Sequence, residues 1–284
     1  MSTKLVREAL TNHWPEYLME AAGLGVFMVS ACVFGAILEH LSSPIRQAIA
    51  DPFLRRIFMG LAMGSTAIGI IFSPWGKQSG AHLNPTVTLT FLRLGKITRA
   101  DAFFYVLFQF AGGIAGVILA ATFLRNTLTH PAVNYVATLP GPNGAGPAFL
   151  AEVLISFILM TVVLIATNVQ SVARFTGLFA GALVATYITF EAPLSGMSMN
   201  PGRTLGSALS AHAWSTLWIY FTAPLLGMLL AAEVYTRFRS ARKLACPKLH
   251  HDNSRRCIFS GTGHKLATSQ TMGAFDEHLE RTPV

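Results

Sequence analysis

Six long apolar runs constrain this sequence more than any other feature. A helix must supply about 20 mostly apolar residues to cross the roughly 30 Å hydrocarbon core of a membrane, and each run is close to that length. Asp, Glu, Lys and Arg make up only 12% of the 284 residues, about half of the roughly 25% found in soluble domains. The sequence therefore predicts an all-α integral membrane protein and argues against a soluble enzyme. The predicted transmembrane helices cover Tyr17–Leu38, Leu54–Phe72, Ala102–Leu124, Ala148–Asn168, Phe175–Phe190 and Trp214–Phe238.

The basic residues predict how these helices are oriented. The net charge is +8, and nine of the 21 Lys and Arg residues lie between Arg237 and Arg281. Six crossings place both termini on one side, which then holds 16 basic residues against five on the other. Since cytoplasmic loops carry the excess of Lys and Arg, we expect both termini in the cytoplasm and the protein in the plasma (cell inner) membrane. The positive charge then reflects membrane orientation and not a nucleic-acid partner.

The two ends of the chain differ from the apolar part between them. Residues 1–16 are polar, which predicts a cytoplasmic N-terminal segment and not a secretory signal. Residues 240–284 are polar and basic, which predicts a disordered cytoplasmic tail close to anionic lipid. The cysteines and histidines of the tail match no standard zinc spacing, so we expect no bound metal and no cofactor. These residues are Cys246, His250, His251, Cys257 and His264.

Two shorter apolar segments, Pro85–Leu92 and Pro201–Leu209, do not fit a count of six crossings. At a rise of 1.5 Å per residue, each covers about 12–15 Å as a helix, roughly half of the hydrocarbon core. Each segment can therefore enter the membrane without crossing it. Irregular backbone at membrane depth is tolerated only where it is buried in protein or lines a wet cavity. Two re-entrant half-helices therefore predict a cavity inside the membrane.

The sequence also contains an internal repeat. Residues 79–86, SGAHLNPT, match residues 195–202, SGMSMNPG. We place repeat one at residues 17–125 and repeat two at residues 148–239, within a single membrane domain over residues 17–239. Because each repeat contains three crossings, the second repeat must be inverted in the membrane. Inverted repeats whose half-helices meet near the midplane indicate a transport pathway.

An Asn-Pro pair opens each predicted half-helix. Asn is favoured at the N-cap and Pro at the first helical position, so Asn84 and Asn200 should cap helices that begin at Pro85 and Pro201. Each Asn oxygen then accepts from its helix, and its NH2 group points away as a fixed donor. The helix N-termini face each other, each with about half a positive charge, so neutral molecules can pass while protons and cations are repelled. Arg203 is expected to line the outer mouth as a donor and cation barrier.

These features resemble the aquaporin, or major intrinsic protein, family. The resemblance spans about residues 15–240 and rests on Ser-Gly-Ala-His-Leu-Asn-Pro in one half and Ser-Met-Asn-Pro-x-Arg in the other. It implies a passive channel without enzymatic activity, built from six transmembrane helices and two half-helices. It also implies a homotetramer in which each subunit has its own pore. The family's two Asn-Pro-Ala boxes read Asn84-Pro85-Thr86 and Asn200-Pro201-Gly202 here, so Thr86 and Gly202 are expected to alter contacts between the half-helices.

The sequence leaves the transported solute open. Counting back from each Asn, the resemblance places the outer selectivity filter at Gly64, Ile188, Met197 and Arg203. Gly64 and Ile188 replace the aromatic residue and the His of water-selective members, which indicates a wider, less polar opening that the flexible Met197 can partly refill. The family positions that separate subfamilies are closer here to water channels, namely Thr204, Ala208, Tyr220 and Phe221. The resemblance therefore implies water, with glycerol, urea, ammonia and metalloid acids as alternatives.

Two acids, Glu20 and Glu152, lie inside apolar runs. A secondary transporter built on an inverted repeat, the alternative to a channel, would use them as proton relays. Their matching places in the two repeats favour a structural role, in which they accept hydrogen bonds from the loops that lead to the half-helices. We expect no third acid in the core, although a coupled transporter would need further ion ligands. His82 precedes Asn84 by two residues and either lines the inner vestibule or packs in the interior.

Overall fold

The computed structural model describes residues 3–238, 246–250 and 253–259, and none of these is in a β-strand. The described chain is a bundle of helices with short connections. In chain order the helices are α1 Thr3–Glu39, α2 Pro44–Ala48, α3 Pro52–Phe72, α4 Pro74–Ser79, α5 Pro85–Arg93, α6 Arg99–Leu124, α7 Asn126–Thr129, η1 Asn134–Val136, α8 Ala145–Thr167, η2 Ala173–Phe175, α9 Thr176–Phe190, α10 Ala192–Ser195, α11 Pro201–Ala211 and α12 Leu217–Phe238.

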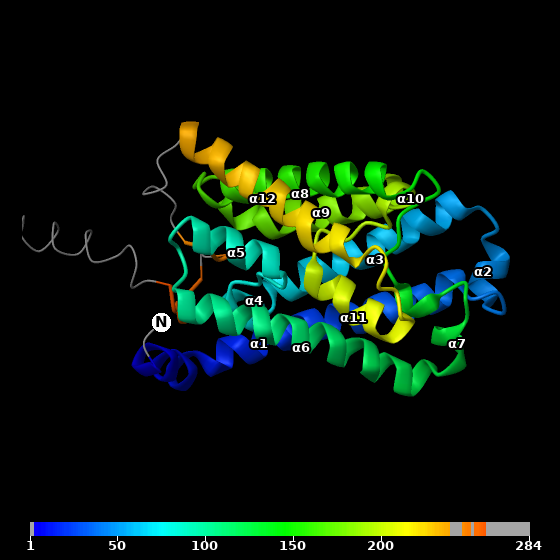
Figure 1. The fold of residues 1–284 in the computed structure, drawn as a ribbon, viewed down its shortest axis with the longest axis horizontal. Coiled ribbons are helices and arrows are strands. Elements are labelled where there is room, and N and C mark those ends of the chain that lie inside the picture. The colour runs from blue at the N-terminus through cyan, green and yellow to red at the C-terminus, as the bar shows by residue number, and fades with distance from the viewer. Residues whose placement is uncertain (1–2, 239–245, 251–252, 260–284) are drawn as a thin grey trace, which may run out of the picture.

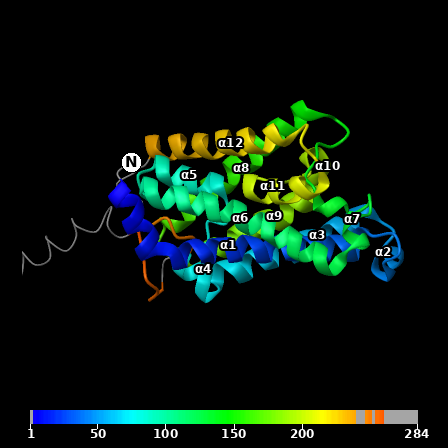
Figure 2. The same ribbon diagram turned by 60° about the horizontal axis from the view of Figure 1, so that its bottom comes forward.

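Six segments of the described chain are long and apolar enough to cross a membrane: α1, α3, α6, α8, α12, and η2 joined to α9. They confirm the predicted all-α membrane fold. The long helices run side by side, and the start of α1 and the end of α12 lie at the same end of the bundle (Figures 1 and 2). We call this the terminal end, and we call the other end, which carries α2 and α7, the far end.

The helix pairing repeats between the two halves of the chain. Helix α1 packs on α6 as α8 packs on α12, and α3 packs on α9. Each half-helix also contacts the last long helix of the other repeat, since α11 packs on α6 and α5 packs on α12. The two halves are therefore interlocked at the centre of the bundle, where α5 and α11 lie (Figure 1).

Glycines allow the long helices to approach closely. A Cβ added to Gly112 of α6 would lie 2.1 Å from the carbonyl oxygen of Ala21 in α1, and one added to Gly116 would lie 2.4 Å from that of Gly25. A Cβ on Gly227 of α12 would likewise lie 2.2 Å from a backbone oxygen of α8. No larger residue fits at these contacts, which are typical of helix packing in membranes.

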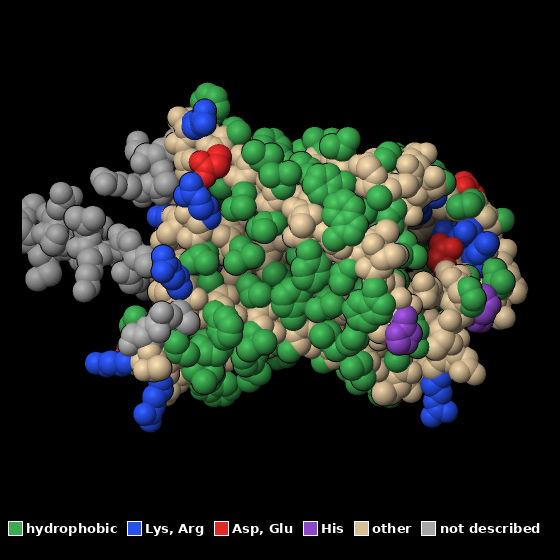
Figure 3. Space-filling model, in the orientation of Figure 1, with side chains coloured by type: hydrophobic (Ala, Val, Ile, Leu, Met, Phe, Trp, Pro, Cys, Tyr) green, Lys and Arg blue, Asp and Glu red, His purple; other side chains and the backbone are tan. Residues whose placement is uncertain are grey.

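The outer surface of the bundle is apolar around its middle. Large side chains are exposed there, including Leu61 at 56%, Leu107 at 50% and Leu154 at 57%. Figure 3 shows hydrophobic side chains across the middle of one face, with Lys and Arg toward both ends. Exposed apolar surface of this extent requires a lipid environment.

The predicted N-terminal segment is helical. Helix α1 begins at Thr3 and not near Tyr17, so residues 3–16 extend the first transmembrane helix. Polar contacts to the first turn of α6 hold this extension, because an Asp101 oxygen lies 2.6 Å from His13 Nδ1 and 2.7 Å from the Tyr17 hydroxyl. The polar residues 3–16 can therefore form a helix because α6 supplies hydrogen-bond partners for side chains at its end.

The predicted disorder of the tail does not hold for residues 246–250 and 253–259, which we call the tail cap. These residues pack against the terminal end of the bundle, where Lys248 is only 2% exposed and Leu249 only 7%. Composition alone could not reveal this, because the contacts are with residues far away in the sequence. The other tail residues, including His251 and His264, lie outside the described part of the chain.

Candidate functional site

The two predicted N-caps are present. Asn84 Oδ1 accepts a hydrogen bond from the backbone nitrogen of Thr86 at 2.8 Å. Asn200 Oδ1 accepts from the backbone nitrogens of Gly202 at 2.9 Å and Arg203 at 3.2 Å. These bonds satisfy helix donors that otherwise have no partner, and they turn each side-chain NH2 group away from its helix.

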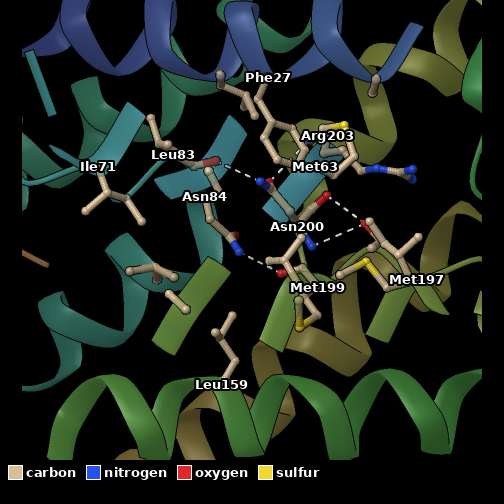
Figure 4. Close-up of a pocket in the computed structure, with 18 of the residues that line it drawn as sticks. Phe27, Met63, Ile71, Leu83, Asn84, Leu159, Met197, Met199, Asn200 and Arg203 are labelled. Atoms are coloured by element: carbon tan, nitrogen blue, oxygen red, sulfur yellow. Dashed lines mark hydrogen bonds between the residues drawn. The ribbon is translucent and has the colours of Figure 1, made fainter. Parts of the chain in front are cut away.

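Each of these NH2 groups is also held by the opposite repeat. Asn84 Nδ2 donates to the carbonyl oxygen of Met199 at 2.7 Å, and Asn200 Nδ2 donates to that of Leu83 at 2.7 Å (Figure 4). Leu83 and Met199 directly precede the two Asn residues, so the bonds form a reciprocal brace. A primary amide has two hydrogens, and one on each Asn therefore remains for a solute.

A cavity of about 270 Å³ passes both Asn side chains. It reaches from His82 and Leu249 at the terminal end to Glu39 and Arg56 at the far end. Most of its wall is apolar, with side chains that include Leu24, Phe27, Met59, Met63, Ile71, Leu159, Val163, Val184, Ile188, Met197 and Met199. A polar solute can form hydrogen bonds only at the few polar groups of this wall. Along the rest of the cavity it is bound weakly and can move on.

Arg203 lies on the wall of this cavity, as do Ile188 and Met197. Arg203 Nη1 is buried and has no hydrogen-bond partner among the described residues. A buried donor without a partner is costly, and here it is available to a solute in the cavity. The structure therefore brings together three of the four residues that the sequence assigned to the filter.

Gly64, the fourth predicted filter residue, does not line the cavity. It faces α9, where an added Cβ would lie 2.6 Å from the carbonyl oxygen of Gly181. The cavity is lined instead by Met63 on the neighbouring face of α3. Counting residues back from Asn84 gives the position along the axis of α3. The direction in which a side chain points, however, changes by about 100° from one residue to the next. The four-residue spacing of the lining residues was the available signal: Met59, Met63, Ala67 and Ile71.

We expect Gly64→Ala to destabilise the protein by about 1–3 kcal/mol, the usual cost of overpacking. The new Cβ would lie 2.6 Å from the backbone of α9 and 3.0 Å from Ala185 Cβ. Gly69→Ala in the same helix is the control, because a Cβ there meets nothing within 4 Å. Thermal unfolding in detergent compares the two variants, and equal midpoints would contradict the packing role of Gly64.

The two departures from the family's Asn-Pro-Ala boxes lie behind the cavity wall. A Cβ on Gly202 would lie 2.9 Å from Leu24 Cδ2 and 3.3 Å from Pro85 Cδ. Leu24 thus takes the space that an alanine methyl would need. Thr86 is 1% exposed, and its Oγ1 has no hydrogen-bond partner among the described residues. Both residues lie in the packing around the half-helices, and the Asn caps are present beside them.

Glu20 makes the loop contacts predicted for it. Its Oε1 accepts from Ser79 Oγ at 2.7 Å and from the backbone nitrogen of His82 at 3.0 Å. Its Oε2 accepts from the backbone nitrogen of Leu83 at 2.6 Å and from Gln109 Nε2 at 2.8 Å. Both oxygens are therefore fully used in holding the loop that leads to the first half-helix.

Glu152 holds the matching loop of the second repeat. Its Oε1 accepts from Ser195 Oγ at 2.9 Å and from the backbone nitrogen of Ser198 at 2.6 Å, and its Oε2 from that of Met199 at 2.7 Å. Both glutamates are 0% exposed. The equivalent bonds in the two halves agree with the predicted structural role of these acids.

His82 combines the two positions that the sequence left open. It lines the cavity, and its ring is also packed, 3% exposed and stacked on Phe91 with centroids 5.1 Å apart. Its Nε2 lies 2.9 Å from the carbonyl oxygen of Pro247 in the tail cap. A carbonyl only accepts, so Nε2 carries the hydrogen. Leu249, also in the tail cap, lines the cavity without any signal in the sequence.

Comparison with known proteins identifies the family. The sequence model described as Major intrinsic protein matches residues 9–235. The chain is 32% identical over 269 residues to Aquaporin NIP2-1 of Oryza sativa subsp. japonica, covering 88% of this chain and 84% of that protein. It is 37% identical over 237 residues to the Probable aquaporin NIP-type of Nicotiana alata, covering 76% of this chain and 84% of that protein.

The structure points to the same family. Its fold is similar to that of the aquaglyceroporin from Plasmodium falciparum, with a TM-score of 0.64 and 20% identity, over 81% of this chain and 98% of that chain. At this identity the similarity concerns the fold alone. The family match, in contrast, spans both repeats and both half-helices. The chain therefore belongs to the major intrinsic protein family, whose members are membrane channels and not enzymes.

Proposed function

We propose that this protein is a passive channel for water and small uncharged solutes that excludes protons and cations. The observation that carries the proposal is the reciprocal brace of Asn84 and Asn200 at the meeting point of two half-helices. A water molecule there can accept from both amides through its oxygen. The positive helix ends repel cations and hydronium at the same point.

The residues near Arg203 favour water among the candidate solutes. The sequence had predicted a wide opening, with Gly64 on one side. Because Met63 and not Gly64 faces the cavity, a long side chain fills part of that space. Three of the residues at this position of the cavity are apolar, namely Met63, Ile188 and Met197. Arg203 is therefore the polar group of the filter. Glycerol, urea, ammonia and metalloid acids are the alternatives that a permeability assay separates.

Glu20 and Glu152, the buried acids inside the predicted apolar runs, favour a passive channel over a coupled transporter. The expectation of no third acid in the core is wrong, since Glu16 and Asp101 are 0% and 1% exposed, but both lie just outside those runs. A transporter needs oxygen ligands or proton relays that are available to the coupling ion. Glu20 and Glu152 instead use their oxygens for the loops before the half-helices. This arrangement supports a fixed pore through which solutes move down their gradients.

We further propose that both termini are cytoplasmic, that the protein resides in the plasma membrane, and that four copies assemble. The excess of basic residues on the terminal side supports this orientation. The family resemblance supports the homotetramer. Light scattering coupled to size-exclusion chromatography in detergent measures the number of copies.

Stopped-flow light scattering of proteoliposomes tests the proposed function. A sucrose gradient should shrink vesicles that contain the protein faster than empty vesicles. A glycerol or urea gradient then shows whether re-swelling follows, which separates a water-selective channel from a broader one. Equal shrinkage of protein-containing and empty vesicles would refute the channel.

Asn200→Asp is expected to lower water flux about tenfold, which corresponds to about 1.4 kcal/mol. The carboxylate keeps the cap to Gly202 and Arg203 but cannot donate to the carbonyl oxygen of Leu83 or to water. Asn126→Asp is the matched control, since Asn126 is exposed and does not line the cavity. The same sucrose assay measures both variants, and wild-type flux in Asn200→Asp would remove this amide from the pore.

A further inference from the structure

The tail cap is attached to the loop that precedes Asn84. The backbone nitrogen of Leu249 donates to the carbonyl oxygen of Gly80 at 3.0 Å, and His82 donates through Nε2 to the carbonyl oxygen of Pro247 at 2.9 Å. The two bonds involve consecutive parts of the same loop. Residues more than 160 positions apart in the chain are therefore joined through backbone groups at the terminal end of the cavity.

A buried lysine holds the two parts of the tail cap together. Lys248 is 2% exposed, and burial lowers the pKa of its amine. Its Nζ donates to the carbonyl oxygens of Lys77 at 3.1 Å and Arg256 at 2.6 Å. A buried amine is costly unless it is hydrogen-bonded. These two bonds therefore tie one part of the tail cap both to α4 and to the other part.

The second part of the tail cap contacts helix α1 and the ring of His82. Arg256 Nη2 donates to the carbonyl oxygen of Asn12 at 2.6 Å, and its Nε lies 3.8 Å from Glu16 Oε1, a carboxylate that is 0% exposed. The Phe259 ring lies 5.9 Å from that of His82 at an interplanar angle of 12°. The tail cap thus contacts α1, α4 and the loop before Asn84 at the terminal end of the bundle.

The seated tail cap extends into the solute pathway. Leu249 lines the same cavity as Asn84, Asn200 and Arg203, and it is 7% exposed. An apolar side chain at the end of a pore offers no hydrogen bond to replace those that water loses on entry. In this position the tail cap supplies part of the pore wall at the terminal end.

Two cysteines join the parts of the tail cap. Cys246 Sγ and Cys257 Sγ lie 3.7 Å apart as hydrogen-bonded thiols, and a disulfide would shorten this separation to about 2.05 Å. The hydrogen bond that the Cys246 thiol shares with Cys257, together with burial, raises the pKa of the Cys246 thiol, so the thiol stays protonated at rest and reacts with an oxidant only slowly. Cys32, in contrast, lies in α1 with 0% exposure, remote from the tail.

We propose that residues 246–250 and 253–259 are a redox-controlled cap on the pore, seated in this structure and fixed in place when Cys246 and Cys257 form a disulfide. This inference rests on the proposed channel function. The oxidant is a peroxide: the two thiols lose two protons and two electrons, one S–S bond forms, and hydrogen peroxide is reduced to two molecules of water. The cross-link closes a loop of about a dozen residues and so lowers the chain entropy of the detached tail cap, which favours the seated state.

Water flux through the full-length protein in liposomes tests the proposal. Vesicles are treated with dithiothreitol or with hydrogen peroxide, and shrinkage in a sucrose gradient is followed by stopped flow. We expect flux to be about tenfold lower after oxidation, from the loss of loop entropy on cross-linking. Peptide mass mapping should find a Cys246–Cys257 disulfide in the oxidised sample only.

Three variants isolate the thiol pair and the seat of the tail cap. The double variant Cys246→Ser/Cys257→Ser should keep high flux with either reagent, whereas Cys32→Ser should respond as the wild type does. Arg256→Ala, which loses the contacts to Asn12 and Glu16, should raise flux under dithiothreitol. Each of these results supports the cap.

Two results would overturn the cap while leaving the channel intact. One is failure of the disulfide to form under peroxide, and the other is a mapped disulfide with unchanged flux in vesicles that still shrink faster than empty ones. Flux at the level of empty vesicles in every variant and redox state would instead overturn the proposed channel function, and the cap with it.

Discussion

Arg203→Ala is expected to raise the permeability to urea and glycerol about tenfold, which corresponds to about 1.4 kcal/mol of barrier. The guanidinium occupies the cavity wall, and its Nη1 has no protein partner among the described residues. Truncation therefore empties space in the filter without breaking an ion pair there. It also removes a positive charge that repels protons and cations, so proton leakage should rise while water flux continues.

Arg56→Ala is the matched control for this prediction. Arg56 lines the same cavity nearer the far end, but its Nε donates to the carbonyl oxygen of Thr189 at 3.3 Å. We expect a smaller change, because this side chain is held against the wall. Stopped flow with urea and glycerol, together with a pH-sensitive dye inside the vesicles, measures all three fluxes. Wild-type rates for urea, glycerol and protons in Arg203→Ala would remove Arg203 from the filter.

Glu152→Ala is expected to cost about 3 kcal/mol or more of stability and to abolish water flux. The substitution leaves three donors without an acceptor, at about 1–3 kcal/mol for each buried group. They are the Ser195 hydroxyl and the backbone nitrogens of Ser198 and Met199. The last of these belongs to the residue whose carbonyl oxygen holds Asn84, so the pore loses its shape with the loop.

Two further variants separate the structural role of Glu152 from its charge. Glu152→Gln keeps one acceptor oxygen and should recover part of the stability. Glu233→Ala removes an exposed acid whose partner, Arg93, is also exposed, and it should cost less than about 1 kcal/mol. Thermal unfolding in detergent and water flux per folded protein test the set. A Glu152→Ala protein as stable as Glu233→Ala would exclude the loop-anchoring role.

The half-helices and their caps could be predicted because their causes are local. The length of each apolar segment, the Asn at its start and the Pro after it are all read within nine residues or so, and their physics does not depend on distant partners. Glu20 and Glu152 could be predicted for a related reason. The internal repeat gave each of them a counterpart, and paired positions implied a shared role.

The filter and the tail could not be predicted as fully because their contacts depend on three-dimensional packing. The choice between Gly64 and Met63 depends on the rotation of α3 against α9, which a count along the sequence does not supply. The tail cap depends on partners such as His82 and Asn12, separated from it by 165 and 244 residues. The composition of such a segment shows how polar it is, but it does not identify the residues against which the segment packs.

The reciprocal brace has a consequence for the biosynthesis of this protein. Asn84 and its acceptor Met199 are 115 residues apart, and Asn200 and Leu83 are 117 apart. At about 5–20 residues per second of translation, Asn84 is synthesised roughly 6–23 s before its acceptor. The Asn84 amide therefore lacks its Met199 acceptor when the first repeat is made, and the reciprocal brace is completed only after the second repeat has been synthesised and inserted.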